Sequence, residues 1–370
     1  MSEAKTPHAV IKVNGKTIAD GFNGRLISVQ ISDKRGITSD TITLELRDGD
    51  PFLAIPEKSD VIEAWLGYLE TGVAYFGKYT IDDPEIKMKP YTLSINGKGA
   101  DMRDGLKAQK GRHFDNKSIH EIVSEIAGEH GLSPMVDPEV GSYVYKWVGQ
   151  QDESDIHFIE RLAKRHGAIF TVKDGKMIFA KKGSEKSASG KKLLAFTATP
   201  QNTIEGSARV VFSHRSKFKS VKAHKQNRET AERDLFSEES DVDGTADFEI
   251  AEPFGDEEEA KIAAKAKGEE LKSKTITTSC QIVGDPRIRA GSPFTYQDMR
   301  PQIDGIAFNI EIATHAISKS GYTTSIDADL NPQKDNEAKK QKKKKARKAK
   351  KGKGETPMRD LDWSDLDNKV

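Results

Sequence analysis

His120 and Glu121 are the residues closest to a metal-site motif in this 370-residue chain. A zinc-protease helix carries two histidines four residues apart, with a glutamate directly after the first. Here Ser124 occupies the second position, and the next histidine along the chain is His130. The zinc motif therefore fails. Ser118, three residues before Glu121, instead predicts a capping box that begins a helix.

Other catalytic and cofactor motifs are absent or incomplete. Residues 97–102 contain two of the three glycines of a dinucleotide fingerprint, but Met102 stands where the third belongs. Neither a GxxxxGK[ST] phosphate loop nor a GxSxG nucleophile elbow occurs. Acidic residues are numerous, but their spacing singles out no catalytic pair. We therefore expect no enzymatic activity, catalytic residue, cofactor, metal or small-molecule substrate.

Composition and charge narrow the class of protein. Cys280 is the single cysteine, which excludes an intrachain disulfide and a cysteine cage for a metal. The first residues lack a signal-peptide pattern, and no apolar run is long enough to span a membrane. We expect folding in a reducing cytoplasm and no membrane contact in the folded state.

The net charge of +1 is the sum of a strongly basic segment and an acidic remainder. Residues 338–354 hold ten Lys, one Arg and no acid, so the remainder of the chain carries a net charge of about −10. An acidic body argues against wrapping nucleic acid with the main surface.

The elements expected from periodicity are mainly strands. Residues 41–47 and 91–95 alternate apolar and polar side chains between turn signals, which predicts a small barrel or sandwich. Residues 109–183 predict helices after Ser118 and over 155–166, and a two-residue hairpin turn at Asp174-Gly175. We expect a polar linker at 184–192, a partly exposed insertion at 214–255, one exposed helix from Asp256, and strands again from Lys274.

The predicted fold class is α+β, mainly β, with two small tube-like β-barrel domains flanking a small α/β domain. The predicted domains are a first barrel (1–108), the α+β domain (109–183), a second barrel with the charged insertion and helix (184–334), and a basic disordered tail with an acidic-aromatic end (335–370).

The two β-regions resemble each other. Thr-Ile-Thr at 41–43 and 275–277, Gly-Asp-Pro at 49–51 and 284–286, and Tyr-Thr-x-Ser-Ile at 91–95 and 322–326 occur in the same order, and Gly77 and Ile81 align with Gly305 and Ile310. Gly-Asp-Pro alone is ordinary turn chemistry, but ordered landmarks predict an internal duplication. Three such chains would present six similar barrels around one axis.

The chain resembles the late control D family, the baseplate hub proteins of contractile-tailed phages. The resemblance is most specific at residues 284–291 (GDPRIRAG), 300–305 (RPQIDG), His315 and 321–324 (GYTT). Residues 153–162 also resemble the hub-like half of type VI secretion spike proteins. The similarity spans roughly residues 8–330, and the basic tail departs from it.

The resemblance implies a homotrimeric virion protein of the tail baseplate, joining the sixfold tail tube to the threefold spike. The implied partners are tube and spike proteins, with the tape-measure protein as a further one. The matched residues are interpreted as architectural: Gly284, Asp285, Pro286, Gly291, Arg300, Pro301, Asp304, Gly305, His315, Gly321, Tyr322 and Thr324.

Four of these residues carry specific expectations. Arg300 and Asp304 are spaced for an ion pair across a loop, either exposed within the chain or at a subunit interface. We expect Gly305 to tolerate substitution less well than His315, because Gly305 occupies a corner and His315 a solvated strand edge.

The alternatives are a tail-associated peptidoglycan hydrolase and a nucleic-acid-binding regulator acting through the basic tail. Near the C-terminus, Leu361, Trp363 and Leu366 punctuate an acidic background, which is compatible with a short docking peptide or with a solvated terminus.

Overall fold

The computed structural model describes residues 5–21, 24–99, 104–183, 192–214, 217–226, 233–240 and 244–337. The chain divides into two compact units, Met1–Pro332 and Gln333–Val370. Of the second unit only residues 333–337 are described. The lysine-rich run, its predicted disorder, and Leu361, Trp363 and Leu366 therefore lie outside the described residues.

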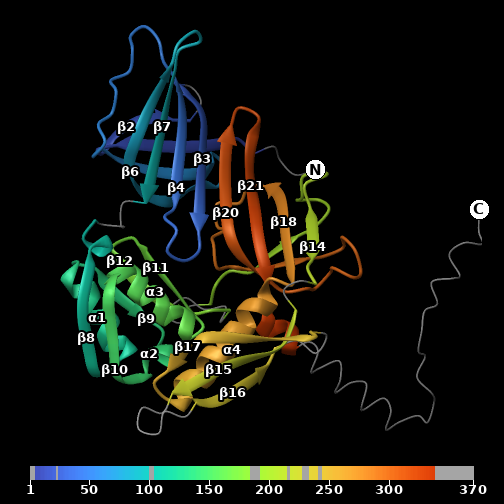
Figure 1. Cartoon of the computed structure of the whole chain (residues 1–370). Coiled ribbons are helices and arrows are strands. Elements are labelled where there is room, and N and C mark those ends of the chain that lie inside the picture. The colour runs from blue at the N-terminus through green and yellow to red at the C-terminus, as the bar shows by residue number, and fades with distance from the viewer. Residues whose placement is uncertain are drawn as a thin grey trace, which may run out of the picture. The chain divides into compact units, whose positions relative to one another are not determined.

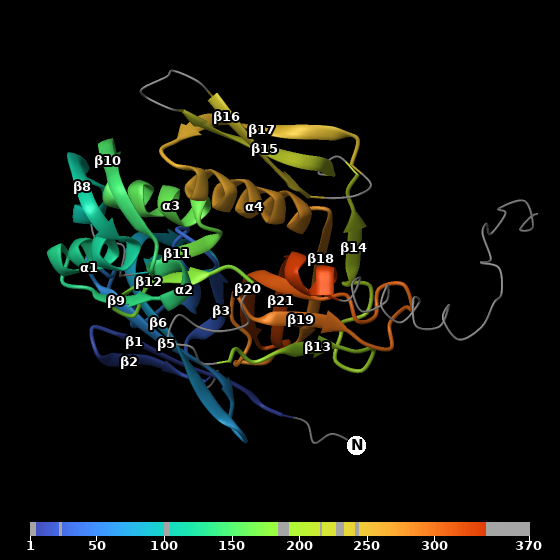
Figure 2. The same cartoon turned by 90° about the horizontal axis from the view of Figure 1, so that it is seen from below.

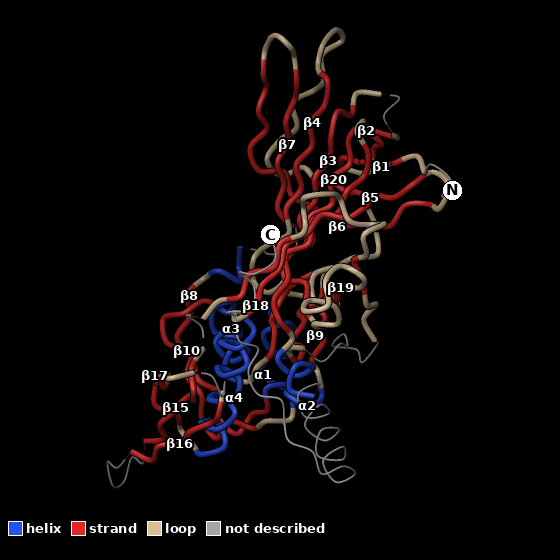
Figure 3. The backbone as a smooth tube through the Cα atoms, turned by 90° about the vertical axis from the view of Figure 1, so that its right-hand side faces the viewer, coloured by secondary structure: helices blue, strands red, loops and turns tan. Residues whose placement is uncertain are grey.

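The larger unit is mainly β with a few helices, which confirms the predicted class. Its N-terminal strands form what we call the first β-unit, which contains only strands and loops (Figure 3). Side chains at every second position of its strands are buried, as the two-residue period of a strand requires. The strands are β1 (Pro7–Val13), β2 (Lys16–Asp20), β3 (Leu26–Lys34), β4 (Thr41–Arg47), β5 (Val61–Tyr68), β6 (Gly72–Lys87) and β7 (Thr92–Gly99).

A second β-unit is assembled from two stretches of sequence, residues 192–214 and 274–331. Its strands are β13 (Phe196–Ala198), β14 (Arg209–Phe212), β18 (Ile276–Val283), β19 (Pro293–Tyr296), β20 (Phe308–Ser318) and β21 (Gly321–Leu330). β20 pairs with β3, so one 13-stranded sheet runs through both β-units (Figure 1). Its strand path does not close on itself among the described strands, so two separate closed barrels are not seen.

The two β-units share a strand order. The sequence β3-β4-β7-β6-β5-β1 in the first corresponds to β14-β18-β21-β20-β19-β13 in the second. The last neighbours differ, since β1 pairs antiparallel with β5 whereas β13 pairs parallel with β19. A register shift follows Ile81 where β6 pairs with β7, and another follows Ile310 where β20 pairs with β21. A bulge at the same place in both units supports the predicted duplication.

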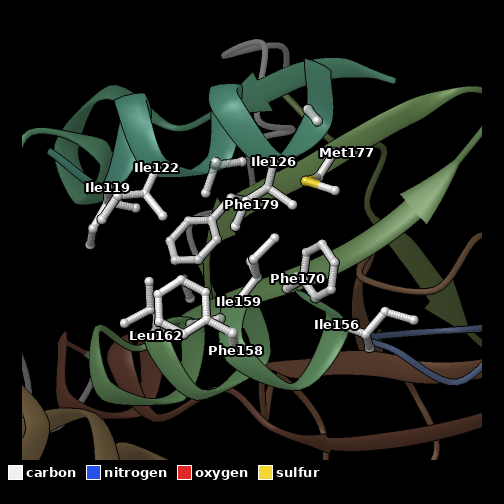
Figure 4. Close-up of a cluster of buried hydrophobic side chains, with 14 of the residues drawn as sticks. Ile119, Ile122, Ile126, Ile156, Phe158, Ile159, Leu162, Phe170, Met177 and Phe179 are labelled. Atoms are coloured by element: carbon white, nitrogen blue, oxygen red, sulfur yellow. The ribbon is translucent and has the colours of Figure 1, made fainter. Parts of the chain in front are cut away.

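Residues 104–183 form a compact α/β region around a core of its own. In Figure 4, Phe158, Phe170 and Phe179 fill the space between two helices and two strands. The elements are η1 (Asp104–Lys107), β8 (Gln109–Ser118), α1 (Ile119–Glu129), β9 (Ser133–Val136), α2 (Pro138–Gly141), β10 (Val144–Ser154), α3 (Asp155–Arg165), β11 (Ala168–Lys173) and β12 (Lys176–Lys181).

Two local predictions are confirmed in this region. The backbone N–H of Glu121 donates to the Ser118 hydroxyl, and the Glu121 carboxylate accepts from the Ser118 N–H, which is the capping box. The β11–β12 turn has positive φ at both Asp174 and Gly175, as a two-residue hairpin of the primed type requires.

The insertion forms a small sheet covered by a helix (Figure 2). It comprises β15 (Phe218–Gln226), β16 (Arg233–Glu239), β17 (Ala246–Phe254) and α4 (Glu257–Ser273). The predicted helix is confirmed, but the expected exposure is wrong. Ala260, Ala263 and Ala264 are buried against Val221 and Ala223, because a stripe of small side chains lets the helix approach the sheet closely.

We predict that Phe158→Ala lowers the free energy of unfolding by about 3–5 kcal/mol, because a fully buried ring is replaced by a cavity. Val144→Ala, at a half-exposed position of β10, is the matched control and should change it by less than about 1 kcal/mol. Urea denaturation of both variants checks this. Equal effects would contradict the assigned core.

Candidate functional site

Several residues of the family motif meet at the seam between the two β-units. Gly284 directly follows β18, His315 lies within β20, and Tyr322 and Thr324 lie on β21. β20 and β21 pair antiparallel, which places His315 opposite Thr324. Residues up to 40 positions apart in the sequence therefore form one cluster, which we call the seam cluster.

His315 is the centre of the seam cluster and is completely buried. Its Nδ1 lies 2.8 Å from the Tyr322 hydroxyl and 3.1 Å from that of Thr324, and its Nε2 lies 3.1 Å from the Ile288 carbonyl oxygen. A carbonyl only accepts, so Nε2 carries the proton and Nδ1 accepts from the hydroxyls. The expected solvated strand edge is wrong, because β3 covers this part of β20.

The surroundings keep His315 neutral. Burial lowers the pKa of His315 to about 3, and the positive charge of Arg289 acts in the same direction. Burial also raises the pKa of Tyr322, which keeps its hydroxyl protonated as a donor. The network therefore satisfies both ring nitrogens without a charge, as a stable buried polar group requires.

Gly284 is needed because of Tyr322. A Cβ at position 284 would lie 2.2 Å from the Tyr322 ring. The Gly284 carbonyl accepts from the Tyr68 hydroxyl of the first β-unit at 2.8 Å, and Tyr68 and Tyr322 stand with ring centroids 5.4 Å apart. Gly284 is thus a direct point of contact between the two β-units.

Asp285 holds the loop that begins at Gly284. Its N–H donates to the Thr324 hydroxyl, and its carboxylate accepts from the Arg287 N–H at 3.0 Å and guanidinium at 2.7 Å. Burial opposes ionisation, but the hydrogen bonds from Arg287 outweigh it and lower the pKa of Asp285. Asp285 therefore acts as a turn residue in this loop, next to Pro286.

The first β-unit covers the seam cluster with aromatic side chains. Phe76 packs edge-on against His315 at a centroid distance of 4.7 Å. The Arg289 guanidinium lies over the Phe76 ring at 3.9 Å and donates to the Tyr75 carbonyl at 3.1 Å. Residues 284–292 between β18 and β19, which we call the motif loop, are thereby held against β6.

A group of charged residues that the sequence did not single out lies beside the seam. Lys173, at the end of β11, forms ion pairs with Asp33 and Asp40 of the first β-unit, and the second Asp33 oxygen accepts from the Ala290 N–H at 3.0 Å. Burial raises the pKa of Asp40 to about 6, with the Asp33 charge adding to it. A cavity of 240 Å³ lies next to this group.

The two carboxylates are suited to holding the fold together. Burial disfavours the Lys173 charge, but Asp33 and Asp40 outweigh it and raise the pKa of Lys173. Asp40 also accepts from the Lys34 N–H at 2.8 Å. This group links the first β-unit, the α/β region and the motif loop. The sequence predicted the hairpin turn that follows Lys173, but it did not indicate that the Lys173 side chain forms ion pairs.

The remaining motif residues do not join the seam cluster. Gly291 and Gly305 have φ of +88° and +77°, so both use the left-handed freedom of glycine. Asp304 accepts from the N–H groups of Met299 and Arg300, and the Arg300 side chain donates to Gln302. The predicted Arg300–Asp304 ion pair is not among the contacts of the described residues. Pro301 lies in the same β19–β20 loop, and Gly321, with φ of +136°, begins β21.

A second cluster has side chains suited to a metal but is already neutralised. Glu129, His130 and Asp155 bring three ligand atoms within 4.8 Å of one another. Lys110 lies 2.7 Å from Asp155 and 2.9 Å from Glu129, and Arg112 also pairs with both carboxylates. The two cations already neutralise both carboxylates, so these residues fit an ion-pair network better than a metal site.

Comparison with known proteins identifies the kind of protein that contains this seam. The phage tail baseplate hub (GPD) family model matches residues 66–321, which include the seam cluster. The chain belongs to this family. The probable baseplate hub protein of Escherichia phage 186 is 26% identical over 375 residues, covering 90% of this chain and 96% of that protein.

Solved structures agree with this hub assignment in fold. The 43 kDa tail protein of prophage MuSo2 from Shewanella oneidensis has a TM-score of 0.67 at 17% identity, covering 88% of this chain and 99% of its own. The E. coli c3393 protein, a type VI secretion component with structural similarity to T4 tail proteins gp27 and gp5, has a TM-score of 0.55 at 12% identity, covering 86% and 76%.

The family establishes the hub as a structural protein of the phage tail baseplate, as the sequence resemblance predicted. Its place is the virion tail. No helix among the described residues is both long enough and apolar enough to cross a membrane.

We predict that His315→Ala destabilises the hub more than Gly305→Val, the reverse of the order expected from sequence. Removing His315 leaves a buried cavity and unpaired groups on Tyr322 and Ile288, at a cost of about 3 kcal/mol or more. Space around Gly305 is open, so valine there costs only backbone strain of about 1–3 kcal/mol. Thermal melts decide the order, and a lower melting temperature for Gly305→Val would refute this reading.

We also predict that part of the hub's acid sensitivity comes from His315. Its folded pKa of about 3 lies below the unfolded value, so its contribution is present above about pH 6.5 and is lost as pH falls toward 3. Between pH 7 and pH 5 the loss is about 2 kcal/mol. His315→Gln should therefore lose about that much less than wild type in urea denaturation at the two pH values. Identical pH dependence would contradict the neutral buried ring.

Proposed function

We propose that this hub assembles as a homotrimer whose six β-units form a ring. The observation that carries the proposal is the repeated strand order with its bulge at the same place in both units. A closed ring needs similar joints that repeat around its axis. Because each chain has two similar β-units, three chains supply the six units of such a ring. The two units act as tube-like domains flanking the α/β region.

This arrangement suits an adaptor between two symmetries. The β-units would offer a nearly sixfold face to the tail tube protein. The α/β region and the α4 insertion occur once per chain, so they keep the threefold symmetry of the spike. We propose the tube and spike proteins as partners, with the tape-measure protein reaching the same ring.

The proposed role is assembly without a catalytic step, cofactor or small-molecule substrate. Two observations support this role. The family is a structural one, and the motif residues of the seam cluster bond to one another and to the first β-unit. In this proposal Gly284, Asp285, His315, Tyr322 and Thr324 fix the angle between neighbouring units. No observation favours the hydrolase or the nucleic-acid regulator.

The mass of the purified full-length hub in solution, alone and co-expressed with its spike protein, tests the trimer. The expected value is three times the chain mass of 40.9 kDa, either for the hub alone or as three hub chains in the complex with the spike. A hub that is monomeric alone and binds the spike in any ratio other than three to three would overturn the proposal.

A further inference from the structure

The joint between the two β-units inside one chain is made by strand edges. Residues 28–34 of β3 pair antiparallel with residues 312–318 of β20, with His315 opposite Ile31. The Ser32 and Thr314 hydroxyls also lie 3.0 Å apart across this joint. The pairing buries His315 and Ile317 completely.

The repeat also identifies the strand edges that are equivalent to the two edges of this joint. β3 corresponds to β14, and β20 corresponds to β6. β14 pairs only with β18 among the described strands. β6 pairs with β5 only as far as Thr80, so residues 83–87 have a strand partner on the β7 side alone. Each chain therefore carries both halves of a second joint, one on β14 and one at residues 83–87 of β6, and neither has a partner among the described residues.

The apolar exposure at these edges fits a missing partner. The shared bulge aligns Ile86 with His315 and Met88 with Ile317. Ile86 is 41% and Met88 76% exposed, whereas their counterparts are fully buried. On β14, Val211 and Phe212 are 37% and 53% exposed. An unpaired strand edge with exposed apolar side chains is a liability that proteins normally cover.

The adjoining loop shows the same contrast. Tyr91 aligns with Tyr322 and is 37% exposed, whereas Tyr322 is 4% exposed. Phe52 follows the first Gly-Asp-Pro, packs edge-on against Tyr91 at 5.4 Å, and is 62% exposed. The first β-unit thus covers the region around Tyr322, whereas the equivalent region around Tyr91 is left exposed.

We infer that a second copy of this chain covers this surface. The outer edge of β14 in one hub pairs antiparallel with residues 83–87 of β6 in the next, in the register of the internal joint. Mapping that register through the repeat sets Val210 opposite Ile86. The inference rests on the proposed trimer and adds the residues that close it. Three internal and three external joints of the same kind complete the ring.

One residue limits the strength of the external joint. Pro84 lies within the β6 edge and has no N–H to donate. Proline and charged neighbours such as Asp83 and Glu85 are also devices that protect an edge from pairing. If the β6 edge pairs with β14 of a second chain, cysteines placed across that joint should cross-link. If the edge is instead protected from pairing, they should not.

Cross-linking through engineered cysteines tests the register. Ile86→Cys and Val210→Cys are combined in the full-length hub, purified alone or with co-expressed spike, and oxidised. The native Cys280 is buried. We expect reducible covalent dimers and trimers, with the trimer as the largest species. Glu85→Cys with Val210→Cys is the matched control and should cross-link at least tenfold less, because adjacent strand residues point to opposite faces.

The outcomes separate this inference from the proposed function. A hub with trimeric mass in which the 86–210 pair cross-links no better than the control overturns the joint and leaves the trimer standing. A hub that is monomeric in every preparation overturns both. A trimeric mass with selective cross-linking supports both.

A charge substitution gives an independent readout. Ile86→Asp should abolish the trimeric mass but leave the melting temperature of the monomer unchanged, because the side chain is exposed within one chain. Val144→Asp, at a comparably exposed position in the α/β region, should alter neither. Retention of the trimer by Ile86→Asp would contradict the joint.

Discussion

The pairing of β3 with β20 is the constraint on which the rest of the larger unit depends. It joins strands whose residues are separated by 282 positions at the Ser32–Thr314 contact, and it extends one sheet through both β-units. Closing so long a loop costs conformational entropy, which the surrounding contacts must offset. The buried seam cluster and the Asp33–Lys173 ion pair both lie next to this joint and depend on it for their desolvation.

The seam cluster is polar, and it is stable because the polar atoms of its buried histidine all have hydrogen-bond partners. A buried imidazole is tolerated because two hydroxyls and a carbonyl match its donor and acceptor sites. Packing alone would allow the two β-units to slide, since apolar contacts have little directionality. Hydrogen bonds at fixed angles select one orientation of the two β-units, which the proposed ring would require.

Local structure was predictable where the signal was local. The Ser118–Glu121 capping box, the Asp174-Gly175 turn and the helix after Asp256 depend on neighbours within a few residues. The duplication was visible from ordered landmarks. Strand pairing nevertheless aligns Ile42, Leu44 and Leu46 with Thr278, Cys280 and Ile282, two residues from the sequence-based match. A shift of two preserves the buried face, so the sequence pattern could not detect it.

Features that depend on distant partners were not predictable. The burial of His315, the ion pairs of Lys173 and the backbone partners of Asp304 depend on segments far apart in the chain or on the exact path of a loop. The covered face of α4 was missed because alanines give a weak hydrophobic signal. A motif search detects the family residues but not which of them share one site.

The internal joint has a kinetic consequence for the proposed ring. Two β-units on one polypeptide find each other at the high effective concentration that a covalent connection provides. Half of the contacts around the circle are then made during folding, at a rate independent of how much protein the cell holds. Only the encounters between chains depend on abundance, so the equilibrium concentration of the proposed ring would scale with the third power of the free chain concentration, whereas a ring of six separate units would scale with the sixth power. The covalent connection of the two β-units would thus let the proposed ring assemble from a more dilute pool of chains.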